Sequence, residues 1–553
     1  MTLLAKAKAQ QAVDASTATK PTVQQTAQIL NISPAWAGVK SNLPTWGNDA
    51  KVETDATPPA VADDAKAPEV PGSISFLECT ESGIAESLGG SYSQHFRQVY
   101  ESGDWLVLND SGVWVTDTGN KSRSYIASAV AVAIQAETQA MIQAGENAEA
   151  RKQGLQRIKQ FSKMRGRREL DNIRELLKDQ PAITIRKREL NSDPWAVAFN
   201  NGIIFDLKRN EAHKIEPSDL IHQTLNVPYV AGASCDLWQR CMDQWFADCP
   251  EVIGLLQRFF GYCMSGLTRE EKLLFFYGKG RNGKGTITKT VETLFGDLST
   301  SWNETVLSHS KSAKAGPNSE VAKAADKLLA ISTELSPDLV MYEAFIKKIT
   351  GGDRFSIEDK FEKSQDIEPR FKLILCGNAL PVVKGQDKGI WSRFLTIPFL
   401  MTFDDSKRDN SLKERILAEL PGIAQWMLAG WQEYQVQGLQ VPAVVTKATD
   451  EYKSEMDLIG QFLDEDYKRD KAGTIPKADL YAAYKTWAES RGAYVLADSM
   501  FGRDLGGRGF GTKQQTNRTT KKRQWVYTGI RRLTDDERKA AYEEALQAEQ
   551  EGC

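Results

Sequence analysis

Hydrophobic and polar positions predict a mixture of strands and helices in the first folded part of the chain. The stretch "WLVLNDSGVWVTDTG" contains two β-rich runs joined by an Asn-Asp-Ser-Gly turn signal, and "VAFNNGIIFDL" (197–207) carries an Asn-Gly turn between apolar runs, which is typical of a hairpin. An Ala-rich helix is predicted over about 124–150. We therefore expect a helical and α+β region here.

A different pattern begins at the apolar run "KLLFFY" and continues to about residue 400. Apolar runs alternate there with helical patterns, which predicts an α/β sheet covered by helices. A helical segment over 411–436 follows. After about 457 a smaller unit begins, in which "IPKADLYAAYKTWAESRG" and "DSMFGRDLGGRGF" each predict a helix.

The two ends of the chain differ from these regions in composition. Residues 1–72 are rich in Ala, Lys, Thr, Asp and Pro and can bury too little apolar surface to offset chain entropy, so a disordered arm is predicted. The predicted domains are the arm (1–72), an N-terminal region (73–265), an α/β core (266–456), a C-terminal unit (457–533) and a charged tail (534–553).

Composition narrows the function classes. The net charge of −3 excludes a globally basic nucleic-acid binder, so such a role must lie in local patches. From Arg151 to Glu189 there are 13 Lys/Arg against 5 Asp/Glu, which is either a solvated helical face or a nucleic-acid contact. The 7 cysteines lack C-x-x-C spacing, which fits reduced thiols better than a zinc site. No apolar run approaches the roughly 18 residues of a membrane span, so we expect a cytoplasmic protein without membrane contact.

The stretch "FFYGKGRNGKGTITKT" (275–290) reads as a strand, a glycine loop and a helix. The pattern G-x-x-x-x-G-K-[ST] cradles nucleotide phosphates on backbone N–H groups and places a hydroxyl on Mg²⁺. The flanking strand and helix strengthen this weak pattern, because a helix N-terminus then points at the phosphates. The candidate nucleotide-binding residues are Gly278, Gly280, Asn282, Gly283, Lys284, Gly285 and Thr286.

Position 285 departs from the usual pattern. Gly285 stands where a Ser or Thr normally binds Mg²⁺, and the first hydroxyl comes one place late, at Thr286. Because Mg²⁺ commonly keeps several waters, one water can replace the missing hydroxyl. We therefore expect an active ATPase with a looser Mg²⁺ requirement rather than a glycine turn with a purely structural role.

Three downstream residues extend the candidate hydrolytic site. Glu334, in the strand "KLLAISTEL", can orient Mg²⁺ or polarise the attacking water, or it can be a helix cap. Asn378, which follows "FKLILCG", can hold the lytic water, and Arg393 can act as an arginine finger on a neighbour's nucleotide or be a surface ion-pair residue. The candidate catalytic residues are Lys284, Glu334, Asn378 and Arg393, and the candidate Mg²⁺ residues are Thr286 and Glu334.

As a set, "GKGRNGKGT", "LLAISTEL", "KKITGGDRFSIEDKF", "LILCGNALP" and "GIWSRFLTIPF" resemble the motifs of superfamily-3 helicases, in particular the phage, plasmid and poxvirus-type primase-helicase branch. The resemblance covers roughly residues 75–530. It implies an AAA+-related P-loop ATPase core, a collar-like N-terminal domain and a C-terminal winged-helix-like domain. It also implies ring hexamers that use ATP and Mg²⁺ to translocate on single-stranded DNA in a bacterial host cytoplasm.

Two regions are candidate nucleic-acid contacts. The stretch 349–369 alternates like a hairpin, and in the family that this chain resembles, the corresponding hairpin grips DNA inside the ring. The C-terminal unit has a basic turn and an aromatic strand, as in the winged-helix module of that family. In both regions the alternative is a solubilising basic surface. The candidate nucleic-acid residues are Lys347, Lys348, Lys360, Phe361, Lys363, Arg503, Arg518, Lys521, Lys522 and Arg523.

These features predict an ATP-dependent DNA helicase that unwinds duplex DNA as a ring oligomer during phage, plasmid or mobile-element replication. Single-stranded and forked DNA are its expected nucleic-acid partners. A separate primase or other replication proteins are the expected partners. One alternative is a bifunctional primase-helicase, although no convincing trio of carboxylates precedes residue 200. Another is an origin-binding initiator that uses ATP as an assembly switch.

Overall fold

The structure is a computed structural model in which the described residues all belong to the unit Pro68–Cys553. The predicted arm and all of the predicted tail after residue 539 lie outside the described part. The described residues are 78–308, 319–357, 365–403, 409, 411–517, 519 and 521–539.

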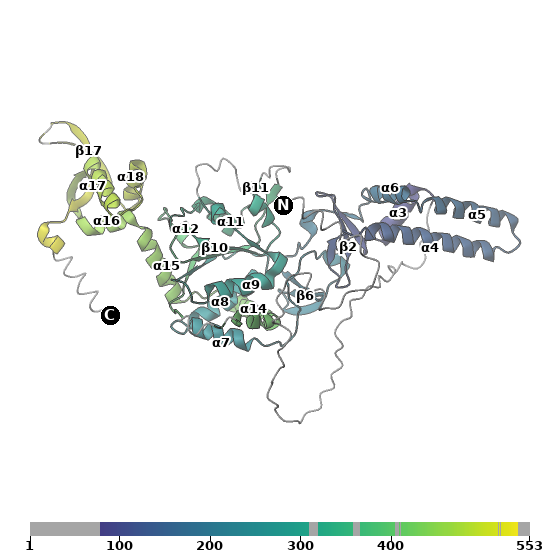
Figure 1. Ribbon diagram of the computed structural model, residues 1–553. Helices are drawn as coiled ribbons and strands as arrows, with labels where there is room; N and C mark the ends of the chain where they lie inside the picture. The colour runs from purple at the N-terminus through teal and green to yellow at the C-terminus, as the bar shows by residue number, and fades with distance from the viewer. Residues whose placement is uncertain are drawn as a thin grey trace, which may run out of the picture. The chain divides into compact units, whose positions relative to one another are not determined.

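The N-terminal region combines helices with a four-stranded sheet of order β3-β2-β1-β4 (Figure 1). The predicted strand pair is confirmed, since β2 and β3 pair antiparallel. Helices α3, α4 and α6 share a hydrophobic core with the sheet. The elements are α3 (Glu81–Ser91), β1 (Phe96–Val99), β2 (Trp105–Leu108), β3 (Trp114–Thr116), α4 (Lys121–Gln143), α5 (Ala148–Lys163), α6 (Arg167–Leu177), β4 (Thr184–Ile185) and the 3-10 helix η1 (Lys187–Glu189).

One predicted helix is shorter in the structure. The Ala-rich helix expected to reach about residue 150 ends at Gln143, and a second helix, α5, begins at Ala148. Gly145 adopts a left-handed φ of 55°, which ends helices, and the Asn147 side chain caps the new N-terminus by accepting from Ala150 N. The prediction missed this break because the alanine-rich composition continues across it.

The hairpin predicted at 197–207 is confirmed as a pair of antiparallel strands, extended by a third strand into a small sheet of order β5-β6-β7. Two helices follow and lead into the central sheet. These elements are β5 (Ala196–Phe199), β6 (Ile203–Asp206), β7 (Glu211–Lys214), η2 (Pro217–Asp219), α7 (Asp236–Trp245) and α8 (Glu251–Cys263).

The central sheet has five strands in the order β14-β8-β13-β10-β9, and every neighbouring pair is parallel. The predicted α/β sheet covered by helices is therefore confirmed. The strands are β8 (Leu273–Tyr277), β9 (Ser299–Ser301), β10 (Leu329–Leu335), β13 (Lys372–Gly377) and β14 (Phe394–Pro398).

Strand β8 shows why these runs are apolar throughout. Leu274 and Phe276 point into a core shared with α7, α8, α9 and α14, whereas Leu273 and Phe275 point into a second core shared with α11 and α12. Figure 1 shows α8, α9 and α14 on one side of the sheet and α11 and α12 on the other. A parallel sheet covered on both faces needs apolar side chains at successive positions.

The helix predicted over 411–436 is two helices, α13 and α14. Pro421 lies at the start of α14, where its missing N–H is tolerated, and it cannot continue the helix that ends at Ala418. The core helices are α9 (Lys284–Phe295), η3 (Gly296–Leu298), η4 (Glu304–Val306), α10 (Ser319–Lys323), α11 (Glu343–Thr350), α12 (Lys388–Trp391), α13 (Leu412–Ala418), α14 (Leu420–Gln437) and α15 (Ala443–Met456).

The C-terminal unit has the order helix, strand, two helices, two strands, with an antiparallel sheet of order β15-β17-β16. Both predicted helices are confirmed as α17 and α18. The elements are α16 (Leu458–Asp466), β15 (Tyr467–Pro476), α17 (Lys477–Ser490), α18 (Asp498–Gly507), β16 (Gly511–Thr516) and β17 (Arg523–Arg532).

Among the described residues, no helix combines the length and the apolar character that crossing a bilayer requires.

Candidate functional site

The glycine loop and two downstream candidates lie at one edge of the central sheet. Tyr277, the last residue of β8, pairs with Gly377, and Gly377 also pairs with Leu335 of β10. Gly278, Glu334 and Asn378 adjoin these three paired positions. The carboxyl ends of parallel strands meet at a common edge, where α/β proteins bind ligands. The fold therefore brings the loop, Glu334 and Asn378 to the same edge.

The loop borders a cavity of about 310 Å³. Its lining includes Asn378 from the next strand and Lys413 from α13, so three separate segments meet there. Helix α9 begins at Lys284, and its first N–H groups lack partners within the helix. The cavity is lined by Gly280, Arg281, Asn282, Gly283, Lys284, Gly285, Thr286, Asn378 and Lys413.

Glycine is required at position 283 by both backbone and packing. Gly283 has φ 94°, and a Cβ there would lie 2.6 Å from the Trp245 ring of α7. At Gly278, a Cβ would lie 2.6 Å from Asn282 Nδ2 and 2.7 Å from the Phe399 carbonyl oxygen. These close approaches hold the loop against buried side chains, which preorganises its backbone.

Lys284 is 7% exposed, and its Nζ donates to the Gly278 carbonyl oxygen at 2.5 Å. The same ammonium lies 5.9 Å from the centroid of the Phe399 ring. Burial lowers the pKa of Lys284, and the neighbouring Cys376 thiol acts in the opposite direction. A charge on this ammonium is thus weakly solvated, so an anion in the cavity stabilises it.

Gly285 is exposed, and a Cβ built on it meets no atom within 4 Å. Sterics therefore do not demand glycine at the position that departs from the usual pattern. Thr286 is half-buried and lines the cavity. The only hydroxyl among the described residues that line the cavity is that of Thr286.

Glu334 is exposed and has φ 69°, within an interruption of the β10–β13 register between Ser332 and Leu335. A left-handed backbone is uncommon for a residue other than glycine, and such strain concentrates at functional sites. Here it turns the chain at the sheet edge while Ser332 and Leu335 stay buried. Glu334 does not itself line the 310 Å³ cavity.

Arg393 lies at the other end of the sheet. The next residue, Phe394, pairs with Leu273, the first residue of β8, about 13 Å along the strand from the loop. Its guanidinium bonds Glu271 Oε2 at 2.8 Å and Thr350 Oγ1 at 3.0 Å, and also the Gly389 carbonyl. The structure therefore does not bring Arg393 to the loop of its own chain.

Lys413 is a cavity residue that sequence reasoning missed. It is exposed at the start of α13 and faces the loop from a segment about 130 positions downstream. The surrounding "SKRDNSLKERI" holds four cations with no motif to distinguish them. Lys413 is distinguished from the other cations only by the packing of α13 beside α9, which places it at the cavity.

The hairpin predicted at 349–369 is confirmed in its stem. Strands β11 (Phe355–Ile357) and β12 (Gln365–Ile367) pair antiparallel, and the tip residues Lys360, Phe361 and Lys363 lie outside the described residues. Lys347 and Lys348 lie on α11, which precedes the hairpin. Lys347 is ion-paired with Asp387 at 2.8 Å, and Lys348 lies 5.0 Å from the Phe355 ring centroid at the hairpin base.

The candidate cations of the C-terminal unit gather on two elements. Arg503 is exposed on α18, and Lys521, Lys522 and Arg523 are exposed where the β16–β17 connection enters β17. Arg518 lies outside the described residues. Arg508 is engaged in ion pairs with Asp504 and Asp457.

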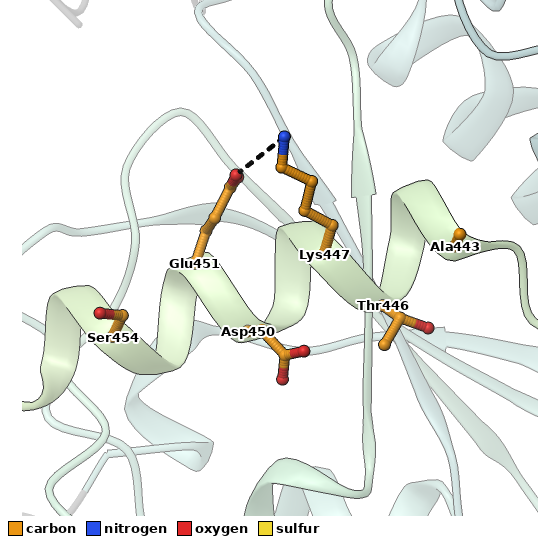
Figure 2. Close-up of a pocket in the computed structure, with 6 residues that line it drawn as sticks. All are labelled: Ala443, Thr446, Lys447, Asp450, Glu451 and Ser454. Atoms are coloured by element: carbon orange, nitrogen blue, oxygen red, sulfur yellow. Dashed lines mark ion pairs between the residues drawn. The ribbon is translucent and has the colours of Figure 1, made fainter. Parts of the chain in front are cut away.

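A second hollow, of about 650 Å³, lies along the exposed face of α15 (Figure 2). All six lining residues come from this one helix, and two of them, Lys447 and Glu451, form an ion pair at 3.7 Å. A single helix face with no opposing wall does not enclose a ligand. We assign it no role.

Three family models match the chain. Residues 85–261 match "D5 N terminal like", 276–393 match a family of unknown function (DUF5906), and 454–529 match "Poxvirus D5 protein-like". Lys284, Glu334, Asn378 and Arg393 all fall within the second match.

Curated relatives are viral. The chain is 25% identical over 336 residues to "Putative helicase L207/L206" of Acanthamoeba polyphaga mimivirus, covering 55% of this chain and 34% of that protein. It is 28% identical over 240 residues to "Putative helicase 022R" of Frog virus 3, covering 40% and 25%. The matches span about a third or less of these relatives' length. A solved structure of the NrS-1 C-terminal region aligns with a TM-score of 0.40 and 15% identity, over 65% of this chain and 89% of that one.

The structure is thus a mixed α/β fold with a parallel central sheet, and parts of the chain are similar to viral proteins named as putative helicases. The two D5 models flank the central sheet in the order of the chain. In these two segments, residues 85–261 and 454–529, the chain is similar to D5-type proteins.

Proposed function

We propose that this protein is an ATP-dependent DNA helicase that works as a ring of identical subunits during replication of a phage, plasmid or other mobile element. The observation that carries the proposal is the sheet edge that holds the glycine loop, Glu334 and Asn378. The loop and Asn378 line a cavity there, together with Lys413. Arg393, at the opposite end of the sheet, suits a contact with the next subunit.

The cavity fits a triphosphate. The positive N-terminal end of α9, the Lys284 ammonium and the Lys413 side chain all favour anions. Thr286 and Glu334 would hold Mg²⁺, with a water in place of a hydroxyl at position 285. Bound MgATP would supply the phosphoanhydride whose hydrolysis drives movement. This chain's residues would position it, with Asn378 orienting the attacking water.

The proposed DNA contacts lie apart from this cavity. The β11–β12 hairpin would present Lys360, Phe361 and Lys363 to a single strand in the ring, where cations neutralise phosphates and an aromatic ring stacks on bases. Lys348 lies at the hairpin base, whereas Lys347 must first leave Asp387. The C-terminal unit has the element order of a winged helix, in which Arg503, Lys521, Lys522 and Arg523 would meet duplex DNA.

An unwinding assay on forked DNA tests the proposal. We expect strand separation with ATP and none with a non-hydrolysable analogue. In the presence of the analogue, the measured molecular mass of the assembly should be that of a ring of several subunits. Melting with the analogue would instead support the switch-type initiator. Primer synthesis on a single-stranded template by the purified chain would support the bifunctional primase-helicase.

The variant Gly285→Ser tests the role of water at the metal. The added hydroxyl has room, and in the usual loop it binds Mg²⁺ directly, so we expect half-maximal ATPase activity at about 2- to 10-fold lower Mg²⁺. Gly285→Ala is the matched control, because it adds a Cβ without an oxygen. Equal Mg²⁺ titrations for the wild type and Gly285→Ser would refute the idea that water replaces the hydroxyl.

The variant Lys413→Ala tests whether Lys413, a cavity residue that the sequence did not reveal, takes part in nucleotide binding. If the Lys413 ammonium contacts a phosphate, removing it should raise the KM for ATP by about 10-fold, because one charge-assisted hydrogen bond contributes roughly that factor to binding. Lys388→Ala is the control, because Lys388 lies on α12 and does not line the cavity. Equal KM values for the two variants would remove Lys413 from the site.

A further inference from the structure

Helix α5 and the turn after it carry a positive charge that the proposed function leaves unused. Between Ala150 and Arg168 there are eight Lys or Arg and no Asp or Glu. Solvated helices usually pair such cations with carboxylates three or four positions away. This segment instead intersperses them with Gln153, Gln156 and Gln160. Glu149, in the first turn, is the one carboxylate on this helix, so α5 has a net positive charge.

One of the eight cations has a structural role. Arg157 Nε donates to Glu137 Oε1 of α4 at 2.7 Å, and its guanidinium lies 6.0 Å from the Phe161 ring centroid. Gly154 packs on Met141 of α4, and Phe161 is buried. Figure 1 shows the two helices side by side. This face holds α5 in place and leaves the opposite face to solvent.

The other seven cations are exposed. Arg167 is ion-paired at 3.9 Å with Asp171, which also pairs with Arg123 at 3.2 Å. The remaining six form no ion pair with any residue in the described part of the chain. Besides Asp171, the first turn of α6 contributes the carboxylate of Glu169. The seven exposed cations are Arg151, Lys152, Lys159, Lys163, Arg165, Arg167 and Arg168.

Three of these cations form a straight stripe. Lys152, Lys159 and Lys163 are 7 and 4 positions apart, which places them within about 40° of one another around the helix. The rises between them are about 10 and 6 Å, and each strand of a duplex carries one phosphate per about 3.4 Å of helix axis, so phosphate charge is available along the whole length of the stripe. Arg165, Arg167 and Arg168 continue the positive surface beyond the helix end.

We propose that the exposed basic face of α5 and the α5–α6 turn bind the phosphodiester backbone of duplex DNA, a surface distinct from the hairpin and the C-terminal unit. This inference rests on the proposed function only for the presence of DNA near the protein. The stripe carries no aromatic side chain that could stack on unpaired bases, so the contact reads the backbone and not the sequence.

The test compares two triple variants of the full chain. Lys152→Gln/Lys159→Gln/Lys163→Gln removes the stripe while keeping good helix formers. Lys208→Gln/Arg209→Gln/Lys214→Gln removes the same charge from exposed positions near β6 and β7, where Asp206, Glu211 and Glu216 already balance it. Fluorescence anisotropy measures binding of a labelled duplex, and of one of its strands alone, between about 50 and 200 mM salt.

We expect the stripe variant to bind the duplex at least about 10-fold more weakly. The slope of the logarithm of the binding constant against the logarithm of the salt concentration should be smaller in magnitude by about 3, because each lost phosphate contact lowers that slope by about 0.9. The control variant should keep the wild-type slope. Equal slopes for the two variants, or a loss seen only with the single strand, would overturn the proposal.

The outcome separates this inference from the proposed function. ATP hydrolysis without DNA should be unchanged in the stripe variant. If no variant hydrolyses ATP but duplex binding still depends on the stripe, the helicase proposal fails and the inference stands. If ATP-driven unwinding is found and the stripe variant binds duplex like the control, the inference fails alone.

Discussion

Replacing Lys284 with Ala should lower the kcat of ATP hydrolysis by at least about 100-fold, the usual cost of removing one preorganised charge partner from a developing negative charge. The Lys284 ammonium is buried at the start of α9, where few waters can take its place. A steady-state phosphate-release assay measures the effect.

Lys279→Ala is the matched control, because Lys279 belongs to the same loop, is exposed and does not line the cavity. It should hydrolyse ATP within about 2-fold of the wild type, since a screened surface charge contributes little. Because Lys284 also bonds the Gly278 carbonyl, thermal unfolding should accompany the assay. Hydrolysis at the wild-type rate by a folded Lys284→Ala protein would exclude this loop as the catalytic site.

Replacing Arg393 with Ala should lower ATP hydrolysis by about 1,000-fold while leaving nucleotide affinity nearly unchanged, as expected for a finger that acts on charge in the transition state. To act, Arg393 must leave Glu271, Thr350 and the Gly389 carbonyl. The Glu271 carboxylate is 53% exposed, so the ion pair contributes only about 0–1 kcal/mol, and the nucleotide of the next subunit must also compensate for the two hydrogen bonds.

Mixing inactive subunits tests whether sites are shared. A Lys284→Ala subunit still carries Arg393, and an Arg393→Ala subunit still carries Lys284, so adjacent copies can assemble one complete site. We expect mixtures of the two variants to recover hydrolysis that neither shows alone. Glu271→Gln controls for the local ion pair and should stay active. Mixtures as inactive as their components would place Arg393 in a structural role within its own chain.

The local elements of the core were predictable because their signals lie close together in the chain. The strand, loop and helix from Leu273 to Phe295 carry continuous apolar positions, glycines and a helical face within 23 residues. The hairpin at Ala196–Asp206 has its turn residues between its strands. The breaks at Gly145 and Pro421 were missed because the helical composition continues across them.

The candidate site was predictable only in part. Sequence order alone placed Glu334 near the end of one apolar strand and Asn378 after another, and parallel pairing then brings both to the sheet edge that carries the loop. Lys413 carried no signal, because many exposed lysines look alike in sequence. The engagement of Lys347 by Asp387 was equally invisible, since the partners are 40 residues apart.

By itself, the sequence determined the chemistry available to this protein: a glycine loop with its lysine, the carboxylate, amide and guanidinium that follow it, and a run of unbalanced cations before residue 169. The tertiary structure decided which of these groups meet. Strand order puts Gly278, Glu334 and Asn378 at one edge and Arg393 at the other, and helix packing adds Lys413 and turns the α5 cations outward. The reason is physical, because local patterns depend on neighbouring residues, whereas contacts between distant segments depend on how buried faces pack.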